Sequence, residues 1–315
     1  MLRSAVFVAA LSLCGLACAS SWAQGADEAD RLDRQILRYS ERLRKEPWNV
    51  VDRVNRGHAW KEKGEYDKAI ADFNVAIILR PWSSRAYYGR GSAWQDQGQH
   101  DAAIRDYSEA IRLDGDDPAF YMDRAISWYE KHEDQKSIAD FNRAIELDPD
   151  DPEAYYNRAN VWLRQHDNDK AIAGYSEALK LDPDHYQALV NRGVVFKRKK
   201  DYREAIGDHR RAIAVDPDGY MPYYYLAMIL ACSPDETIRD GKTAVKHATR
   251  ACELTGWDNP MTLGVLAAAH AEAGDFAKAI ESQRKANALF DDPDDRRDGE
   301  EQLKLYKNRK PRRLG

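Results

Sequence analysis

Small and aromatic residues alternate along this chain in a pattern that repeats at a constant interval between positions 50 and 219. Five units begin at Val50, Ser84, Pro118, Pro152 and Tyr186. In each unit the eighth position is small and the eleventh is a large aromatic: Gly57, Gly91, Ala125, Ala159 and Gly193, then Trp60, Trp94, Trp128, Trp162 and Phe196. Positions 20 and 27 are also small, almost always alanine.

This spacing predicts two helices in every unit. Residues at i, i+3, i+4 and i+7 share one face of a helix, and Tyr87, Arg90, Gly91 and Trp94 follow that spacing. Small side chains let antiparallel helices approach closely, and the regular aromatic row predicts a tryptophan core between neighbouring units. Joints such as residues 147–151 place a proline after one helix and acids at the start of the next. No unit can bury its apolar face alone, so we expect the units to stack.

The period, about 34 residues, and these positions resemble the tetratricopeptide repeat family. The resemblance implies an all-α fold, a right-handed α-solenoid of antiparallel helix pairs, with five regular units over residues 50–219. Residues 24–49 then form a linker and an N-terminal capping helix, residues 220–259 a sixth unit with an insertion at 233–241, and residues 260–293 a seventh unit. From Ala231 to Lys285 the chain is similar to the ending of many bacterial tetratricopeptide proteins.

Finer features are predicted inside the insertion and at the C-terminus. Ser233 to Glu236 has the order of a capping box with proline at the first helical position, which predicts a short ordered turn, and Gly241 predicts a bend. Residues 294–315 predict a capping helix, with its core from Glu301 to Lys310, and a basic tail. The tail is expected either to be solvated, with cations that suit the helix dipole, or to meet an anionic membrane surface.

Residues 1–23 have the features of an export signal: Arg3, an apolar run from Ala5 to Ala19, and a small-residue cleavage site ending at Ala23. A periplasmic or secreted protein is therefore expected, with a lipoprotein anchored at Cys18 as the lesser alternative. Without the signal the net charge is −6, spread in both signs, so neither a nucleic-acid partner nor an integral membrane segment is expected. Cys232 and Cys252 are expected to be buried thiols, too far apart to bridge.

No arrangement of residues predicts catalysis, a cofactor or a metal. Gly89-Arg90-Gly91 lies inside a repeat helix with no strand before it, which argues against a phosphate loop. The joints 148–151 and 216–219 lack the spaced acids of a calcium loop, and the eight histidines lack metal-ligand spacing. Because the repeats occupy nearly all of the chain after the signal, an unrecognised enzyme is the weakest of the alternatives.

An arginine row stands out at position 7, where the family usually has leucine: Arg56, Arg90, Arg124, Arg158 and Arg192. Position 23 supplies acids in four units, Asp72, Asp106, Asp140 and Asp208, with Gly174 as the exception. We expect either ion pairs between packed helices, repeated along the solenoid, or a row of arginines that reaches the binding groove.

In the family, ligands bind the concave face through fixed positions of the first helices. The resemblance places these candidate partner-binding residues on that face: Asn55, Tyr88, Gln95, Asp123, Tyr129, Tyr156, Asn157, Asn160, Arg164, Asn191 and Arg198. The family's charged clamp for chaperone tails would need Lys and Arg beside an Asn pair, and Glu153 and Asp123 depart from it.

This polar, aromatic face suits an extended peptide backbone. The sequence therefore predicts a non-enzymatic scaffold that binds a protein or peptide in its concave groove, and, as the alternative, a scaffold or regulatory subunit of a cell-envelope enzyme complex. The oligomeric state is left open.

Overall fold

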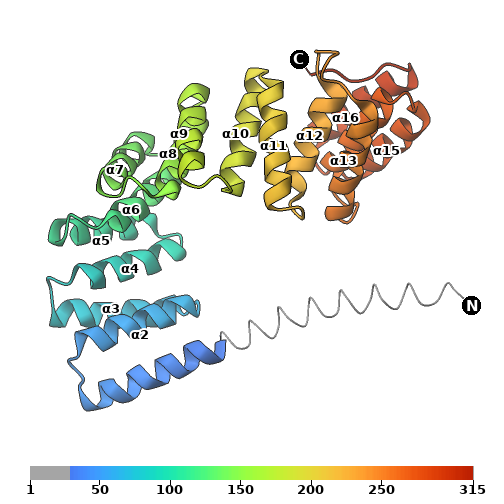
Figure 1. Ribbon diagram of the computed structural model, residues 1–315. Helices are drawn as coiled ribbons and strands as arrows, with labels where there is room; N and C mark the ends of the chain where they lie inside the picture. The colour runs from blue at the N-terminus through green and yellow to red at the C-terminus, as the bar shows by residue number, and fades with distance from the viewer. Residues whose placement is uncertain (1–28, 315) are drawn as a thin grey trace, which may run out of the picture. The chain divides into compact units, whose positions relative to one another are not determined.

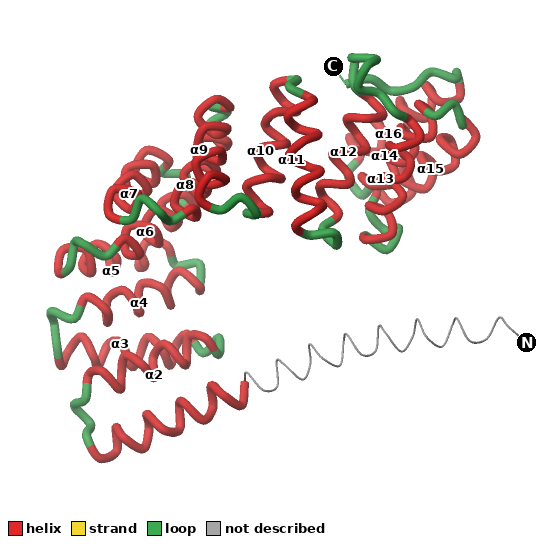
Figure 2. Tube along the Cα trace, viewed as in Figure 1, coloured by secondary structure: helices red, strands yellow, loops and turns green. Residues whose placement is uncertain are grey.

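The computed structural model describes residues 29–314, and this part of the chain is built from helices joined by short loops (Figure 1). The predicted export signal, its cleavage site and the alternative anchor at Cys18 lie outside the described residues. Figure 2 shows helix and loop in the described part and no strand. The fold is the predicted all-α solenoid of antiparallel helix pairs, because consecutive helices pack pairwise along the chain.

The chain divides into two compact units, residues 1–149 and residues 150–315. Unit 1 contains a helix over residues 29–45 and then three pairs: α2 (Val50–Glu62) with α3 (Tyr66–Leu79), α4 (Ser84–Asp96) with α5 (His100–Leu113), and α6 (Pro118–Glu130) with α7 (Asp134–Leu147). Unit 2 contains α8 (Pro152–Arg164) with α9 (Asn168–Leu181), α10 (Tyr186–Lys199) with α11 (Tyr202–Val215), α12 (Tyr220–Cys232) with α13 (Gly241–Leu254), α14 (Pro260–Glu272) with α15 (Phe276–Leu289), and the final helix α16 (Pro293–Lys307).

The joint supplies a side-chain cap for most of the first helices, whereas Ser83 before α4 and Gly219 before α12 make no such bond. The side chains of Asn49, Asp117 and Asp151 accept hydrogen bonds from backbone N–H groups of the first turn, and Pro118 and Pro152 occupy its first position. A capping oxygen satisfies a donor that the helix itself cannot, and proline at that position gives up no hydrogen bond. These caps stabilise the starts of the helices that they precede.

The short turn inside a helix pair contains a residue with positive φ, except in the pair α12–α13, which the insertion separates. Gly64 and Gly98 fill it in the first two pairs, with φ of 77° and 72°. The equivalent residues of the next three pairs are His132, His166 and Lys200, with φ of 60°, 60° and 68°. A side chain with Cβ is strained in this region, so the turns with His132, His166 and Lys200 carry a conformational cost that the glycine turns, including the one at Gly274 between α14 and α15, avoid.

The core lies between the small residues of the first helices and an aromatic row on the second helices. Ala93, Ala125 and Ala159 are buried, and a Cβ added to Gly57 or Gly91 would lie within 3 Å of the ring of Phe73 or Tyr107. Phe73, Tyr107, Phe141 and Tyr175 are almost completely buried, and His209 continues their row.

The predicted tryptophan core is wrong in its placement. Trp60, Trp94, Trp128 and Trp162 are half-buried and pack at the edge of the core. Lys68 lies over the ring of Trp60 at 4.6 Å from its centroid, and Lys136 lies over Trp128 at 4.4 Å. A cation over an aromatic face is attracted electrostatically by the ring. One face of Trp60 and of Trp128 therefore contacts a lysine instead of the apolar core.

The insertion between α12 and α13 forms an ordered turn that contains no helix. The Asp235 backbone N–H donates to Ser233 Oγ at 3.1 Å, and the Thr237 N–H donates to Asp235 Oδ1 at 2.9 Å. Gly241 does not mark a bend, as the sequence suggested, because it is the first residue of α13. A Cβ there would lie 2.5 Å from the backbone nitrogen of Ala273, so the glycine permits close approach of α13 to the end of α14.

The C-terminal helix also differs from the prediction. It runs from Pro293 to Lys307, whereas the predicted span was Glu301 to Lys310. The helix therefore begins before the predicted first residue and ends before the predicted last residue. Asp292 caps it, and the acids Asp294 and Asp295 of its first turn suit the helix dipole. Cys232 and Cys252 are free, buried thiols, as the sequence predicted.

Candidate functional site

The arginine row forms ion pairs inside the solenoid in four repeats. Arg90 Nε and Nη2 donate to Asp106 Oδ2 and Oδ1, both at 2.7 Å. The pairs Arg56–Asp72, Arg124–Asp140 and Arg192–Asp208 repeat this geometry at 2.7–2.8 Å. A planar guanidinium matches a carboxylate in this two-point contact.

Each of these arginines also reaches the preceding pair. Arg90 Nη1 donates to Asn74 Oδ1 at 2.6 Å, and Arg124 Nη1 donates to Ser108 Oγ at 3.0 Å. The remaining two do the same with Ser40 and Ser176. One guanidinium thus connects its own helix with the second helices of its own and the preceding pair. In these four repeats the row is structural and belongs to the ion-pair alternative.

The exception is Arg158, whose repeat has Gly174 in place of the acid. The Arg158 guanidinium lies over the rings of Tyr155 and Trp162, 5.5 and 4.7 Å from their centroids. Burial lowers the pKa of Arg158, whereas the hydrogen bonds that Arg56 and Arg90 donate to Asp72 and Asp106 raise the pKa of these two arginines. A Cβ at Gly174 would lie 2.8 Å from Ala159 Cβ and 3.3 Å from the ring of Trp162, so the two helices approach closely at this glycine.

The predicted binding residues of unit 1 lie on the first helices α2, α4 and α6. Asn55 and Tyr88 line a hollow of about 420 Å³ whose floor includes Val54 and Phe120. Tyr88 hydrogen-bonds Asp123, and burial raises the pKa of that carboxyl group above its usual range. The structure therefore brings Asn55, Tyr88 and Asp123 to one face.

Gln95 and Tyr129 complete the predicted set in unit 1. Gln95 Oε1 accepts hydrogen bonds from Tyr107 at 2.8 Å and from Ser127 at 3.0 Å. Both donors are buried in the protein core. The Gln95 side-chain carbonyl therefore stabilises the fold through these two hydrogen bonds. Tyr129 lies half-buried near the end of α6.

In unit 2 a polar cluster joins α8 with α10. Asn191 Nδ2 donates to Asn160 Oδ1 at 3.1 Å and to the Tyr156 hydroxyl at 3.3 Å. From beneath, the Tyr175 hydroxyl donates to the same Asn160 oxygen at 2.6 Å. The two amides are held at fixed positions by these bonds, while Asn160 Nδ2 and Asn191 Oδ1 make no hydrogen bond among the described residues.

The other predicted residues of unit 2 lie on α8 and α10 outside this cluster. Asn157 is half-buried on α8, and Arg198 is exposed near the end of α10. Neither side chain makes a hydrogen bond within the described part of the chain. Arg164 is the last residue of α8 and is half-buried. Asn157 therefore lies beside the cluster with its amide available, whereas Arg198 stands at the far end of the face.

Two residues of this face were missed from the sequence. Tyr175 belongs to the buried aromatic row of the second helices. This row repeats with the same period as the tryptophans, so the period could have revealed it. His185 caps α10 through its Nδ1 and places Nε2 3.3 Å from Glu153 Oε1. Its ring packs against the ring of Tyr156 in a tilted contact, with the ring centroids 4.8 Å apart. A histidine in a joint has no repeat signal, so only the structure reveals it.

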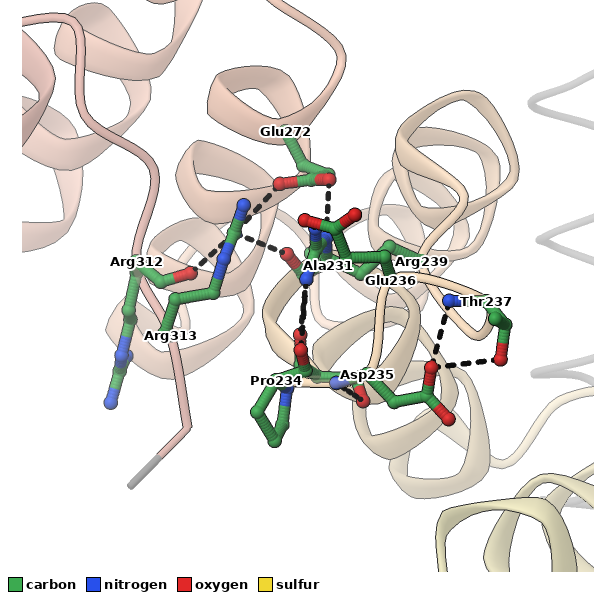
Figure 3. Close-up of polar contacts among 10 residues, drawn as sticks. Ala231, Pro234, Asp235, Glu236, Thr237, Arg239, Glu272, Arg312 and Arg313 are labelled. Carbon is green, nitrogen blue, oxygen red and sulfur yellow. Dashed lines mark hydrogen bonds and ion pairs between the residues drawn. The ribbon is translucent and has the colours of Figure 1, made fainter.

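The C-terminal tail is not a free basic segment. Figure 3 shows Arg313 and Arg239 meeting at Glu272, with Arg313 Nη1 2.7 Å from Oε2 and Arg239 Nε 2.9 Å from Oε1. The Leu314 backbone N–H donates to the Cys232 carbonyl at 2.8 Å, and its side chain packs on the core around α12. Arg313 and Leu314 therefore pack on the chain itself, whereas Lys304 and Lys307 lie in the last turn of α16, where cations suit the helix dipole as expected. Contact of the tail with a membrane stays a prediction.

Arg312 shows where the tail passes. It lines a hollow of about 320 Å³ together with Tyr224 of α12, residues of α14 and the acidic face of α16. The face that α12 and α14 present at this hollow thus meets α16 and the tail of the same chain. In unit 2, the polar cluster on α8 and α10 has no such cover among the described residues.

Sequence comparison identifies the repeats. Residues 84–117 and 152–185 match the profile described as tetratricopeptide repeat, and residues 127–166 match a second profile described as TPR repeat. The chain therefore contains tetratricopeptide repeats, and its helix pairs have the fold of a TPR solenoid. A search of curated proteins finds no match.

Solved structures support the fold. The Cut9–Hcn1 complex of the APC/C is similar with a TM-score of 0.58 at 17% identity, covering 77% of this chain and 47% of that one. PilF of Pseudomonas aeruginosa gives 0.58 at 14% identity, covering 66% and 92%. Yeast Tom70 gives 0.53 at 18% identity, covering 89% and 59%. Similarity at this level of identity shows the fold alone. Among the described residues no helix is both long enough and apolar enough to cross a membrane.

Proposed function

We propose that this chain is a non-enzymatic scaffold that binds an extended segment of a protein partner on the face formed by α8 and α10. The observation that supports it is the fixed amide pair Asn160 and Asn191, with unused hydrogen-bonding groups beside the available amide of Asn157. A primary amide offers both a donor and an acceptor, which matches the alternating groups of a peptide backbone.

Preorganisation favours this face over the other polar surfaces of the unit. Tyr175 and Tyr156 hold the two amides in place before any ligand arrives, so little side-chain entropy is lost on binding. The rings of Tyr156 and His185 add an apolar wall next to the amides. The arginine row, being engaged in ion pairs in four repeats, is not part of the proposed contact.

The hollow of unit 1 is proposed as a second contact for the same class of partner. Its floor of Val54 and Phe120 suits an apolar side chain, and Asn55 at its wall can bond the backbone of the segment that carries it. If the N-terminal segment directs export, as its composition suggests, the partner belongs to the cell envelope.

The test is crosslinking in cells followed by mass spectrometry of the proteins attached to this chain. The variant Asn157→Ala with Arg198→Ala removes two side chains that make no hydrogen bond within the described residues, so the fold should be intact. The control, Glu177→Ala with Lys180→Ala, removes an exposed ion pair on α9 of the same repeat. We expect the partner peptides to be lost in the first variant and kept in the control. Identical partner lists in both variants and the wild type would exclude this face as the binding site.

A further inference from the structure

Two tryptophans are exposed at equivalent joints of unit 1. Trp48 precedes α2 and Trp82 precedes α4, each directly after a proline, and they are 71% and 69% exposed. Because they occupy the same position in consecutive repeats, they lie on the same edge of the unit. Exposing two large aromatic rings on one edge of a monomer is unfavourable unless a partner covers them.

The joints themselves do not require tryptophan. The same position in the next four joints is an exposed aspartate: Asp116, Asp150, Asp184 and Asp218. Two of these joints show how the turn is held, since the Asp184 N–H donates to Asp182 Oδ1 and the Asp218 N–H donates to Asp216 Oδ1, both at 3.0 Å. Acids and a proline are thus sufficient to form the turn, and the turn does not need the rings of Trp48 and Trp82.

Net charge also differs between the two kinds of joint, because cations outnumber the one acid, Glu46, around the two tryptophans. Arg44 and Lys45 stand before the first tryptophan, and Arg80 and Arg85 flank the second. All four are exposed, and within the described residues none of their side chains has an ion pair or hydrogen bond. The later joints of unit 2 instead carry two acids each. Tryptophan and arginine are the residues most enriched at the centres of protein interfaces.

We infer that the edge formed by Trp48 and Trp82 is a docking surface for a second copy of this chain, whose acidic joints at 182–184 and 216–218 supply the opposing carboxylates. The spacing supports this assignment, because consecutive joints are set by the same helix-pair repeat on both surfaces. Two tryptophan joints of one copy can therefore face two aspartate joints of another. Asp218 already pairs with Arg250 at 3.0 Å, but that pair is exposed, and a further cation can share the carboxylate.

Sedimentation velocity over a concentration series tests this inference. The full chain without its signal is run at low and high ionic strength, so that the Debye length falls from about 10 Å to about 3 Å. We expect the average mass to rise with concentration at low salt and the rise to weaken at high salt. The variant Trp48→Asp with Trp82→Asp installs the residue of the later joints and should remain monomeric. The control Trp257→Asp removes an exposed tryptophan of unit 2 and should associate like the wild type.

A charge exchange identifies the opposing surface. Arg80→Asp and Asp184→Arg should each weaken association alone, whereas an equal mixture of the two variants should associate again, because Asp at position 80 of one copy then faces Arg at position 184 of the other. A wild type that is monomeric at every concentration would overturn the inference, as would association that survives loss of both tryptophans or a mixture that fails to recover. Binding of the tryptophan edge to anionic lipid vesicles by a protein that stays monomeric would overturn it in favour of a membrane surface. Groove variants such as Asn157→Ala should not change the sedimentation result.

Discussion

The Arg90–Asp106 ion pair gives the sharpest prediction about stability. Asp106→Ala removes the carboxylate that accepts two hydrogen bonds and leaves the guanidinium with Asn74 as its remaining hydrogen-bond partner. Removing one partner of a fully buried ion pair costs roughly 3–5 kcal/mol. The Arg90 side chain is 22% exposed, so water can replace part of the lost contact, and we expect a loss of about 2 kcal/mol.

Urea unfolding followed by far-UV circular dichroism measures this loss. The control is Glu109→Ala on the same helix, which removes the acid of an exposed pair with Arg112 and should change the unfolding free energy by less than about 0.5 kcal/mol. Replacing Arg90 by Met in the Asp106→Ala background should recover part of the loss, because it removes the buried charge left without its carboxylate. Equal effects of Asp106→Ala and Glu109→Ala would refute the structural role of the row.

Three further predictions concern single positions. His132→Gly relieves a positive φ and should raise the unfolding free energy by about 0.5–1 kcal/mol in urea unfolding; a loss of stability would contradict the strain. Burial lowers the pKa of His209 to about 3 from 6.5. Below pH 6.5 His209 is protonated in the unfolded chain but stays neutral in the folded chain. The unfolding free energy should therefore fall by up to about 1.4 kcal/mol per pH unit below pH 6.5. His209→Phe introduces the residue that two other repeats have at this position and should flatten that slope in melts over a pH series, and an unchanged slope would be inconsistent with the prediction. Gly241→Ala should lower the midpoint of thermal unfolding by overpacking that costs about 1–3 kcal/mol. The control Gly207→Ala places its Cβ in open space and should leave the midpoint unchanged. Equal effects of the two variants would contradict the close approach of α13 to the end of α14.

Local signals in the sequence predict the helices well. Asn49, Asp117 and Asp151 lie before the first helices, and each of them caps its helix as such residues do in isolation. The ion pairs were also predictable, because an arginine and an aspartate recur at one constant spacing in four repeats. A repeated spacing reveals a contact that a single occurrence would not.

Contacts without a repeat could not be predicted. Glu272 joins Arg239 and Arg313, which come from the insertion and from the C-terminal tail, and nothing in the sequence marks these three as neighbours. The half-burial of Trp60 and its relatives depends on how helices cross, which a period alone does not determine. The binding face was predicted only through family resemblance, and the structure adds the hydroxyl of Tyr175 that holds its amides.

The central claim is that the partner binds the face of α8 and α10. Site-specific photo-crosslinking tests it most directly, with the photoreactive amino acid placed at Asn157 on that face or at Lys180 on the second helix of the same repeat. We predict a partner crosslink from position 157 and none from position 180. The same partner captured from both positions, or captured from position 180 alone, would contradict the claim.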